Sequence, residues 1–151
     1  MTEAQVQQLA SRLGPVLPTP LVVYLEGDLG AGKTTFARAL IRGAGYAGRV
    51  KSPTYGILEH YPLSEVEFLH LDLYRIADSG ELDFLGITDL LGARTVLLVE
   101  WPAHGTGRLP RPDLTVAFSH DGEARSLEFQ AHSNSGIQIC DFIREHFQSE
   151  F

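Results

Sequence analysis

Residues 21–36 read LVVYLEGDLGAGKTTF, and this stretch joins an apolar run to a glycine-rich turn and then to a helical pattern. The run at 21–26 has the length and continuous apolarity of a buried parallel strand. After Lys33, apolar residues recur at the spacing of one helix face, until glycines at 43 and 45 end the pattern. A strand, a glycine-rich loop and a helix in this order frame a nucleotide phosphate site.

The loop itself matches the phosphate-loop pattern Gly-x-x-x-x-Gly-Lys-Thr through Gly27, Gly32, Lys33 and Thr34. Glycines allow positive φ angles and bring backbone N–H groups close to an anion, and the following helix adds its positive dipole end. We expect Lys33 to reach the β- and γ-phosphates and the Thr34 hydroxyl to bind Mg²⁺. The alternative is a glycine-rich turn without a ligand. The candidate cofactor-binding residues of the loop are Asp28, Leu29, Gly30, Ala31, Gly32, Lys33, Thr34 and Thr35.

Four further strands are predicted along the chain. Residues 67–74 and 95–101 are apolar runs of strand length, and residues 114–119 and 125–130 flank a turn around Asp121 and Gly122 as a hairpin. Helical patterns cover residues 2–13 with Thr2 as N-cap, 79–91 with a break near Gly86, and a last helix capped by Ser135 that ends at Phe147. Residues 1–151 are therefore expected to form one α/β domain of the P-loop NTPase type. Its sheet should be mostly parallel, flanked by helices, with an antiparallel edge hairpin.

The composition restricts the class of partner. The formal net charge is -7 and no basic run occurs, so this chain is not expected to grip a nucleic acid by itself, and any role near RNA should go through a partner. The single cysteine, Cys140, excludes an internal disulfide and favours a reducing, cytoplasmic setting, with a packing role for the thiol. No apolar stretch reaches the roughly 18 residues of a membrane span.

Two carboxylates are candidates for the metal side of the site. Asp72 lies in one predicted strand and Glu100 ends another, and the carboxyl ends of parallel strands face the ligand crevice. The four apolar residues before Glu100 favour it as the Mg²⁺ ligand, which leaves Asp72 to orient the attacking water. Each could also be a surface acid at a strand end. The six histidines show no metal-ligand spacing and are interpreted as structural or surface groups.

The loop KSPTYG at 51–56 is a candidate switch segment. Thr54 and Ser52 could sense a γ-phosphate, and Lys51 could add positive charge; a plain Ser-Pro turn is the alternative. Lys51 and Lys33 are the only lysines among 12 basic residues, which indicates a need for a compact ammonium at both places, although chance would also explain it.

Missing motifs limit which nucleotide the site binds and which class of protein this is. No Asn-Lys-x-Asp element occurs and no Asp-x-x-Gly follows the second strand, which argues against a Ras-like GTPase. Three classes remain: an ATPase that drives a partner, a P-loop kinase acting on a small metabolite, and a nucleotide-sensing module without useful turnover. A kinase would need a second pocket and an arginine-bearing lid, for which Arg108 and Arg111 are candidates. The ATPase is the most economical of the three.

Four stretches together resemble the TsaE (YjeE) family: GDLGAGKTTF at 27–36, KSPTYG at 51–56, HLDLYRIAD at 70–78 and LLVEWP at 97–102, in this order. The phosphate loop alone is common to many ATPases, whereas its combination with SPTY, DLYR and EWP is far more specific. The family is a bacterial ATPase needed for the threonylcarbamoyladenosine modification of tRNA, at the adenosine next to the anticodon.

The resemblance implies roles for particular residues. Gly30 to Thr35 would hold the ATP phosphates, and Thr34 and Glu100 would bind Mg²⁺. Asp72 matches the acid of DLYR, Thr54 the switch threonine of SPTY, and Trp101 the tryptophan after the metal acid. The resemblance also implies that Arg125, after the hairpin turn, reaches the nucleotide. It implies one departure, since Val6 stands where family members often carry a threonine that approaches the nucleotide.

The resemblance also implies the setting. Such proteins work with TsaB and TsaD-type partners, which carry out the transfer to tRNA, so contact with tRNA would be indirect. Hydrolysis is expected to be weak for the chain alone and to rise with those partners, in the cytoplasm and without a membrane.

Overall fold

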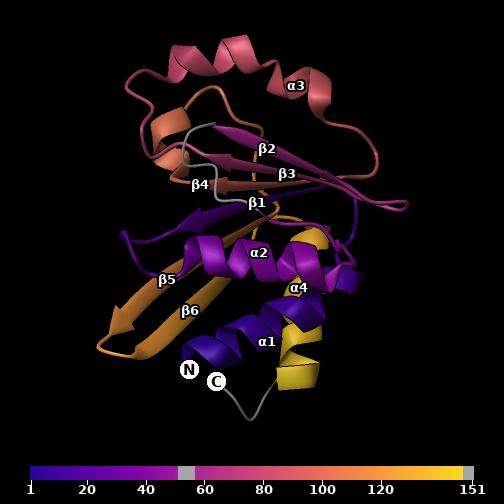
Figure 1. Ribbon diagram of the computed structural model, residues 1–151, viewed down its shortest axis with the longest axis vertical. Helices are drawn as coiled ribbons and strands as arrows, with labels where there is room; N and C mark the ends of the chain where they lie inside the picture. The colour runs from indigo at the N-terminus through magenta and orange to yellow at the C-terminus, as the bar shows by residue number, and fades with distance from the viewer. Residues whose placement is uncertain (51–56, 148–151) are drawn as a thin grey trace.

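The computed structural model describes residues 1–50 and 57–147, which form a six-stranded sheet in the order β2-β3-β4-β1-β5-β6 with helices on both faces (Figure 1). The strands are β1 Leu21–Glu26, β2 Leu58–Pro62, β3 Glu67–Asp72, β4 Thr95–Glu100, β5 Leu114–Asp121 and β6 Ala124–Ala131. The α-helices are α1 Glu3–Leu13, α2 Lys33–Gly43, α3 Ile87–Leu90 and α4 Asn134–Phe147. Short 3₁₀ helices are η1 Gly14–Val16, η2 Ser79–Leu85 and η3 Pro102–Gly105.

The centre of the sheet is parallel and both of its edges are antiparallel. Strand β1 pairs in parallel with β4 and β5, and β3 pairs in parallel with β4. The predicted hairpin is confirmed as β5–β6, and the predicted α/β class with a mostly parallel sheet is confirmed with it. The second antiparallel edge, β2 against β3, was not expected. Its sequence LEHYP is short, carries the charged Glu59 and ends in a proline, features that suit an exposed edge strand.

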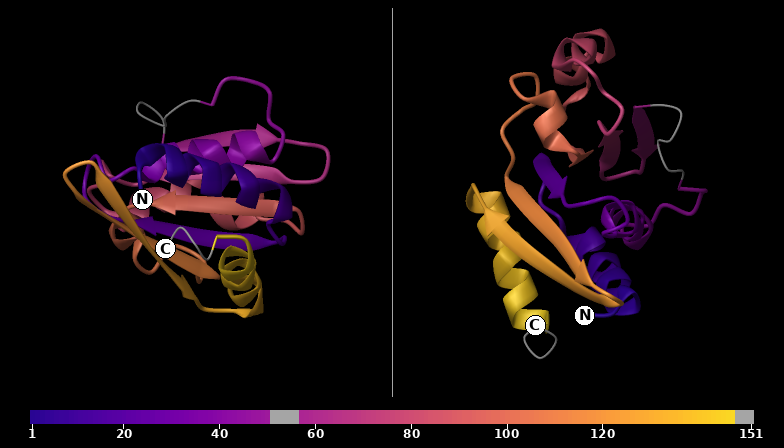
Figure 2. Two further views of the ribbon diagram at one scale, coloured as in Figure 1. Left: turned by 90° about the horizontal axis from the view of Figure 1, so that it is seen from below. Right: turned by 90° about the vertical axis from the view of Figure 1, so that its left-hand side faces the viewer.

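Residues of strand β4 alternate between two hydrophobic cores, one on each face of the sheet. All six of its residues are buried, as expected for a central parallel strand. Val96 and Leu98 pack in the cluster that includes α1, α2 and α4, whereas Leu97 and Val99 pack in the cluster beneath η2 and α3. Figure 1 shows these two groups of helical elements on opposite sides of the sheet, and Figure 2 shows α4 beside the β5–β6 hairpin.

The first helix forms as its sequence predicts. The Thr2 hydroxyl accepts a hydrogen bond from the Gln5 N–H, and the Gln5 side chain accepts one from the Thr2 N–H, so a capping box fixes the start of α1. The residues expected on its inner face, Val6, Leu9, Ala10 and Leu13, are its buried residues. The helix broken at Gly86 is also confirmed, as η2 followed by α3.

The start of the last helix corrects the sequence prediction. Helix α4 begins at Asn134, so Ser135 lies inside it and does not cap it. Ser133 takes that place, because its hydroxyl accepts from the Gly136 N–H at 3.2 Å and donates to the Asp113 carboxylate at 2.7 Å. The hydrogen bond to Asp113, the residue before β5, therefore explains why Ser133 caps the helix and Ser135 does not.

Because β1, β3 and β4 run parallel, their C-terminal ends lie side by side. In the register, Leu25 lies beside Glu100, and Asp72 lies beside Glu100 on its other side. Helix α2 begins at this same end of the strands (Figure 1). Across the described ranges, no helix has both the length and the apolarity to cross a membrane.

Candidate phosphate-binding site

The loop between β1 and α2 has the backbone of an anion cradle. Gly27, Gly30 and Gly32 have φ angles of 146°, 78° and 106°, which side-chain-bearing residues rarely adopt. A Cβ atom on Gly27 would lie 2.6 Å from the Phe118 carbonyl oxygen, whereas Gly30 and Gly32 have no atom within 4 Å of that position. The first glycine is thus needed for packing against β5, and the other two for the shape of an open loop.

Lys33 is buried at the start of α2, with 4% of its surface exposed. Its ammonium donates to the Gly27 carbonyl and, at 3.5 Å, to the Asp28 carbonyl. It also lies 3.6 Å from the centroid of the Trp101 ring. Burial lowers the pKa of Lys33, and the carboxylates of Glu100, Asp72 and Asp28 act in the opposite direction. The loop therefore holds a poorly solvated cation where phosphate charge would need one.

Thr34 and Glu100, the two predicted Mg²⁺ ligands, contact each other in the structure. The Thr34 hydroxyl lies 2.9 Å and 3.0 Å from the two carboxylate oxygens of Glu100, which is 2% exposed. Within the described residues, no group of three or more His, Cys, Asp or Glu side chains could hold a metal ion. A pair of oxygen ligands still fits Mg²⁺, because that ion keeps several waters and takes phosphate oxygens beside one or two protein ligands.

Asp72 ends β3 next to this pair. Its carboxylate accepts a hydrogen bond from the Tyr74 N–H at 3.0 Å. Burial raises the pKa of Asp72 and the Glu100 carboxylate raises it further, while the Tyr74 N–H, His70 and Lys33 act in the opposite direction. A carboxylate in such a position can accept a hydrogen bond from a water and orient it.

His70 is the site residue that sequence reasoning missed. Its Nε2 lies 2.6 Å from Oε2 of Glu100, with both side chains buried. The sequence shows only that His70 precedes Asp72 by two residues and so shares its face of β3. The contact with Glu100 depends on the pairing of β3 with β4. The neighbours Leu69 and Leu71 belong to the core of the opposite face.

Trp101 closes the site on the side of η3. It adopts a left-handed backbone with φ of 58°, unusual for a residue other than glycine. Its ring stacks on His104, with centroids 5.6 Å apart, and the Tyr74 ring lies 5.1 Å away. The His104 Nδ1 lies 2.8 Å from the Leu73 carbonyl oxygen, which fixes the imidazole behind the indole.

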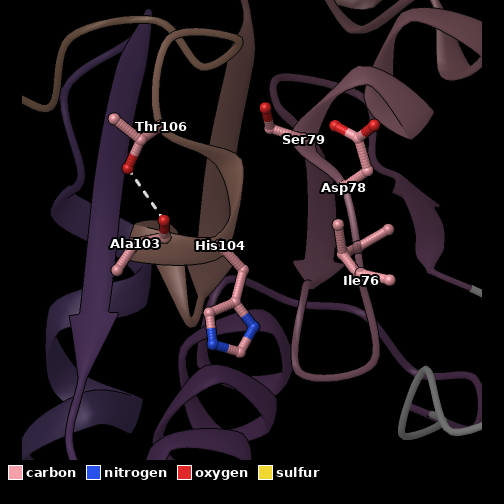
Figure 3. Close-up of a pocket in the computed structure, with 7 residues that line it drawn as sticks. Ile76, Asp78, Ser79, Ala103, His104 and Thr106 are labelled. Atoms are coloured by element: carbon pink, nitrogen blue, oxygen red, sulfur yellow. Dashed lines mark hydrogen bonds between the residues drawn. The ribbon is translucent and has the colours of Figure 1, made fainter.

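An open cleft of about 640 Å³ begins on the far side of His104. Figure 3 shows His104 on one wall and Asp78 with Ile76 on the other, and the Thr106 hydroxyl donates to the Ala103 carbonyl at 2.8 Å. The lining residues are Ile76, Ala77, Asp78, Ser79, Ala103, His104 and Thr106. The Trp101 ring lies between His104, which lines the cleft, and Lys33 of the phosphate loop.

The remaining candidates lie elsewhere. Lys51, Ser52 and Thr54 fall outside the described residues. Arg125 lies at the hairpin tip, where its guanidinium donates to the Gly122 carbonyl at 3.1 Å and its backbone pairs with Met1.

Two further expectations concern Val6 and Arg108. Val6 is packed in the core beneath α1, so its side chain fills space there. Arg108, a candidate lid residue, forms a partly exposed ion pair with Asp83 of η2 at 3.3 Å.

Comparisons with known proteins show the family and the fold. The family model of the threonylcarbamoyl adenosine biosynthesis protein TsaE matches residues 1–127. A Haemophilus influenzae tRNA threonylcarbamoyladenosine biosynthesis protein TsaE is 44% identical over 119 residues, covering 79% of this chain and 75% of the relative. The protein of the same name from Bacillus subtilis is 35% identical over 126 residues, covering 83% and 78%. The crystal structure of Bacillus subtilis YdiB superposes with a TM-score of 0.78 at 28% identity, covering 97% of this chain and 91% of that one.

Proposed function

The chain belongs to the TsaE family of tRNA threonylcarbamoyladenosine biosynthesis proteins, and from this membership we propose that it is the Mg²⁺-dependent ATPase of that modification. The observation that carries the proposal is the contact between Thr34 and Glu100 beside a glycine loop that holds Lys33. Hydroxyl, carboxylate and ammonium are the groups that phosphoryl transfer in P-loop NTPases requires.

Each group has a role in the proposed reaction. The loop N–H groups and Lys33 bind and orient the β- and γ-phosphates. Thr34 and Glu100 would hold the Mg²⁺ ion, which supplies charge neutralisation on the phosphate oxygens when bound. Asp72, with its raised pKa, accepts a hydrogen bond from the attacking water and orients it. Thr54 remains the proposed sensor of the γ-phosphate, and Arg125 a proposed nucleotide contact.

The proposed partners are TsaB and TsaD-type proteins, with tRNA reached only through them. The net charge of -7 supports this arrangement, because tight binding of a polyanion needs clustered basic residues. A cytoplasmic setting follows from the same proposal.

A second candidate is a P-loop kinase acting on a small metabolite. The cleft lined by residues of η2, η3 and their flanks favours it, because the cleft is large enough for a small molecule. Its polar groups, Asp78, Ser79 and Thr106, could hold a hydroxylated acceptor.

An ATPase assay separates the two candidates. We expect slow phosphate release from the chain alone, a clear rise on adding TsaB and TsaD-type proteins, and their co-precipitation in an ATP-dependent manner. Phosphate transfer to an added metabolite, with no effect of the partner proteins, would show instead that the chain is a kinase.

A further inference from the structure

The imidazole of His70 lies directly behind the Glu100 carboxylate. His70 pairs with Leu98 in the β3–β4 register, so Glu100 is its diagonal neighbour on the same face. The side chain is fully buried and its Nε2 lies 2.6 Å from Oε2. Among the described residues, its Nδ1 has no hydrogen-bond partner.

The contacts indicate which nitrogen carries the proton. An ionised carboxylate only accepts hydrogen bonds, so Nε2 must donate across the 2.6 Å contact. The opposite tautomer would place a lone pair against the carboxylate and leave a buried N–H unpaired. An unpaired buried donor is rarer in proteins than an under-satisfied acceptor, so the Nε2–H form is favoured.

Packing alone does not account for an imidazole at this position. The flanking residues Phe68, Leu69 and Leu71 are all buried and apolar, and a leucine would continue that pattern. Burying an imidazole with one nitrogen unpaired costs free energy that an apolar side chain would avoid. Such a residue is expected where function requires it.

We infer that His70 is a positioning residue, whose Nε2–H fixes the Glu100 carboxylate beside Thr34 for binding of a divalent cation. The inference rests on the proposed function, since it explains how the Glu100 carboxylate of the proposed Mg²⁺ site is oriented. Because the Nε2–H of the buried His70, on the interior strand β3, donates to Oε2, the carboxylate keeps one orientation. Both carboxylate oxygens then stay beside the Thr34 hydroxyl, Oε1 at 2.9 Å and Oε2 at 3.0 Å. Groups that orient metal ligands in this way typically change metal affinity about 10-fold to 100-fold when they are removed.

The test compares two substitutions at the same position. His70→Leu removes the donor and keeps an apolar volume, whereas His70→Gln offers an amide N–H at a similar reach. Mn²⁺ serves as the probe ion, and its affinity for the protein–ADP complex is measured by electron paramagnetic resonance. ADP affinity is measured separately in EDTA. Phe68→Leu, on the same face of β3 two residues earlier, is the matched control for lost packing.

The expected result is a loss of about 10-fold or more in Mn²⁺ affinity for His70→Leu, with recovery of most of it in His70→Gln. Metal-free ADP affinity and the Phe68→Leu control should keep the wild-type values. If His70→Leu does not fold, His70→Asn replaces it, because its shorter amide does not reach Oε2.

Three outcomes count against the inference in different ways. Unchanged Mn²⁺ affinity in His70→Leu, with normal Mn²⁺ binding by the wild-type complex, refutes the role of His70 alone. A wild-type protein that binds ADP without any Mn²⁺ site refutes the proposed function and the inference together. Equal losses in the Leu and Gln variants also count against a role for the N–H.

Discussion

At the scale of single residues, the site gathers one buried cation among several carboxylates. Lys33 has Asp28, Asp72 and Glu100 near enough to oppose the fall of its pKa, and its ammonium donates to loop carbonyl groups. The Lys33 ammonium and the Glu100 carboxylate are buried, so each of these charges depends strongly on its neighbours. Substitutions here should therefore change binding and stability in opposite directions.

Lys33→Ala should remove most of the affinity for nucleoside phosphates. A hydrogen bond to a charged group contributes about 1.5–3 kcal/mol, so ADP binding should weaken about 10-fold to 100-fold. Calorimetric titration with ADP measures this loss. Arg42→Ala, at an exposed position in the last turn of the same helix, should bind ADP like the wild-type protein. Unchanged ADP affinity in Lys33→Ala would refute the phosphate cradle.

Asp72→Asn should stabilise the fold while it abolishes hydrolysis. Because burial raises the pKa of Asp72 in the folded protein, folding disfavours its charged form. The gain from asparagine should be present at pH 7, decline as the pH falls through the folded pKa, and vanish below the ordinary value of 3.8. Melting temperatures of both proteins between pH 7.5 and 4.5 test this, with phosphate release measured in parallel. A lower melting temperature for the variant at pH 7 would contradict the argument.

Sequence reasoning proposed site residues wherever a role could be argued from local order. Lys33 and Thr34 are set by the loop pattern, and Glu100 by its place after an apolar run. The role of His70 depends on the pairing of β3 with β4, which no local pattern encodes. Its contact with Glu100 could be known only after the register was known.

At the scale of elements, segments with a clear period were predictable and the others were not. Helix α1 and the β5–β6 hairpin have strong patterns and formed as expected. Strand β2 was missed because only Tyr61 of its residues is buried, so its sequence has no alternation to detect. The loop between β1 and α2 was predictable because its glycines stand at the fixed spacing of the phosphate-loop pattern, where the backbone needs positive φ angles.

Gly27→Ala should damage the loop more than a substitution at another glycine with positive φ. Gly27 and Gly45 have φ of 146° and 115°, but only Gly27 would bring a Cβ atom against Phe118. Both alanines should therefore carry a backbone cost of roughly 1–2 kcal/mol. Gly27→Ala should add about 1–3 kcal/mol of overpacking. Denaturant unfolding measures the difference.

The same pair of variants also tests the link from loop to ligand. Relief of the contact with Phe118 requires the loop to move away from β5, so Gly27→Ala should lose ADP affinity and Gly45→Ala should retain it. Equal stability and equal affinity in the two variants would show that the loop tolerates a side chain at its first glycine.

At the scale of the whole molecule, a set of stabilising hydrogen bonds lies at the ends of the strands opposite the phosphate loop. Sheet order was not predictable, because β1 pairs with strands distant in sequence, β4 and β5. Asp113 precedes β5 at the end of the strands away from the phosphate loop, and it connects β1, β5 and the start of α4. Its carboxylate accepts from the Val22 N–H at 2.8 Å and from the Ser133 hydroxyl at 2.7 Å, linking β1 and the start of α4 to β5.

Asp113→Ala should therefore destabilise the fold without changing the site. Loss of two hydrogen bonds to a carboxylate should lower the free energy of unfolding by about 3 kcal/mol or more. ADP affinity of the folded protein should stay at the wild-type value, because no site residue contacts Asp113 among the described hydrogen bonds. Asp141→Ala, which breaks an exposed ion pair with Arg144, is the control and should cost less than about 1 kcal/mol. If ADP affinity falls in Asp113→Ala under conditions where it remains folded, the two ends of the strands are coupled and the separation argued for is wrong.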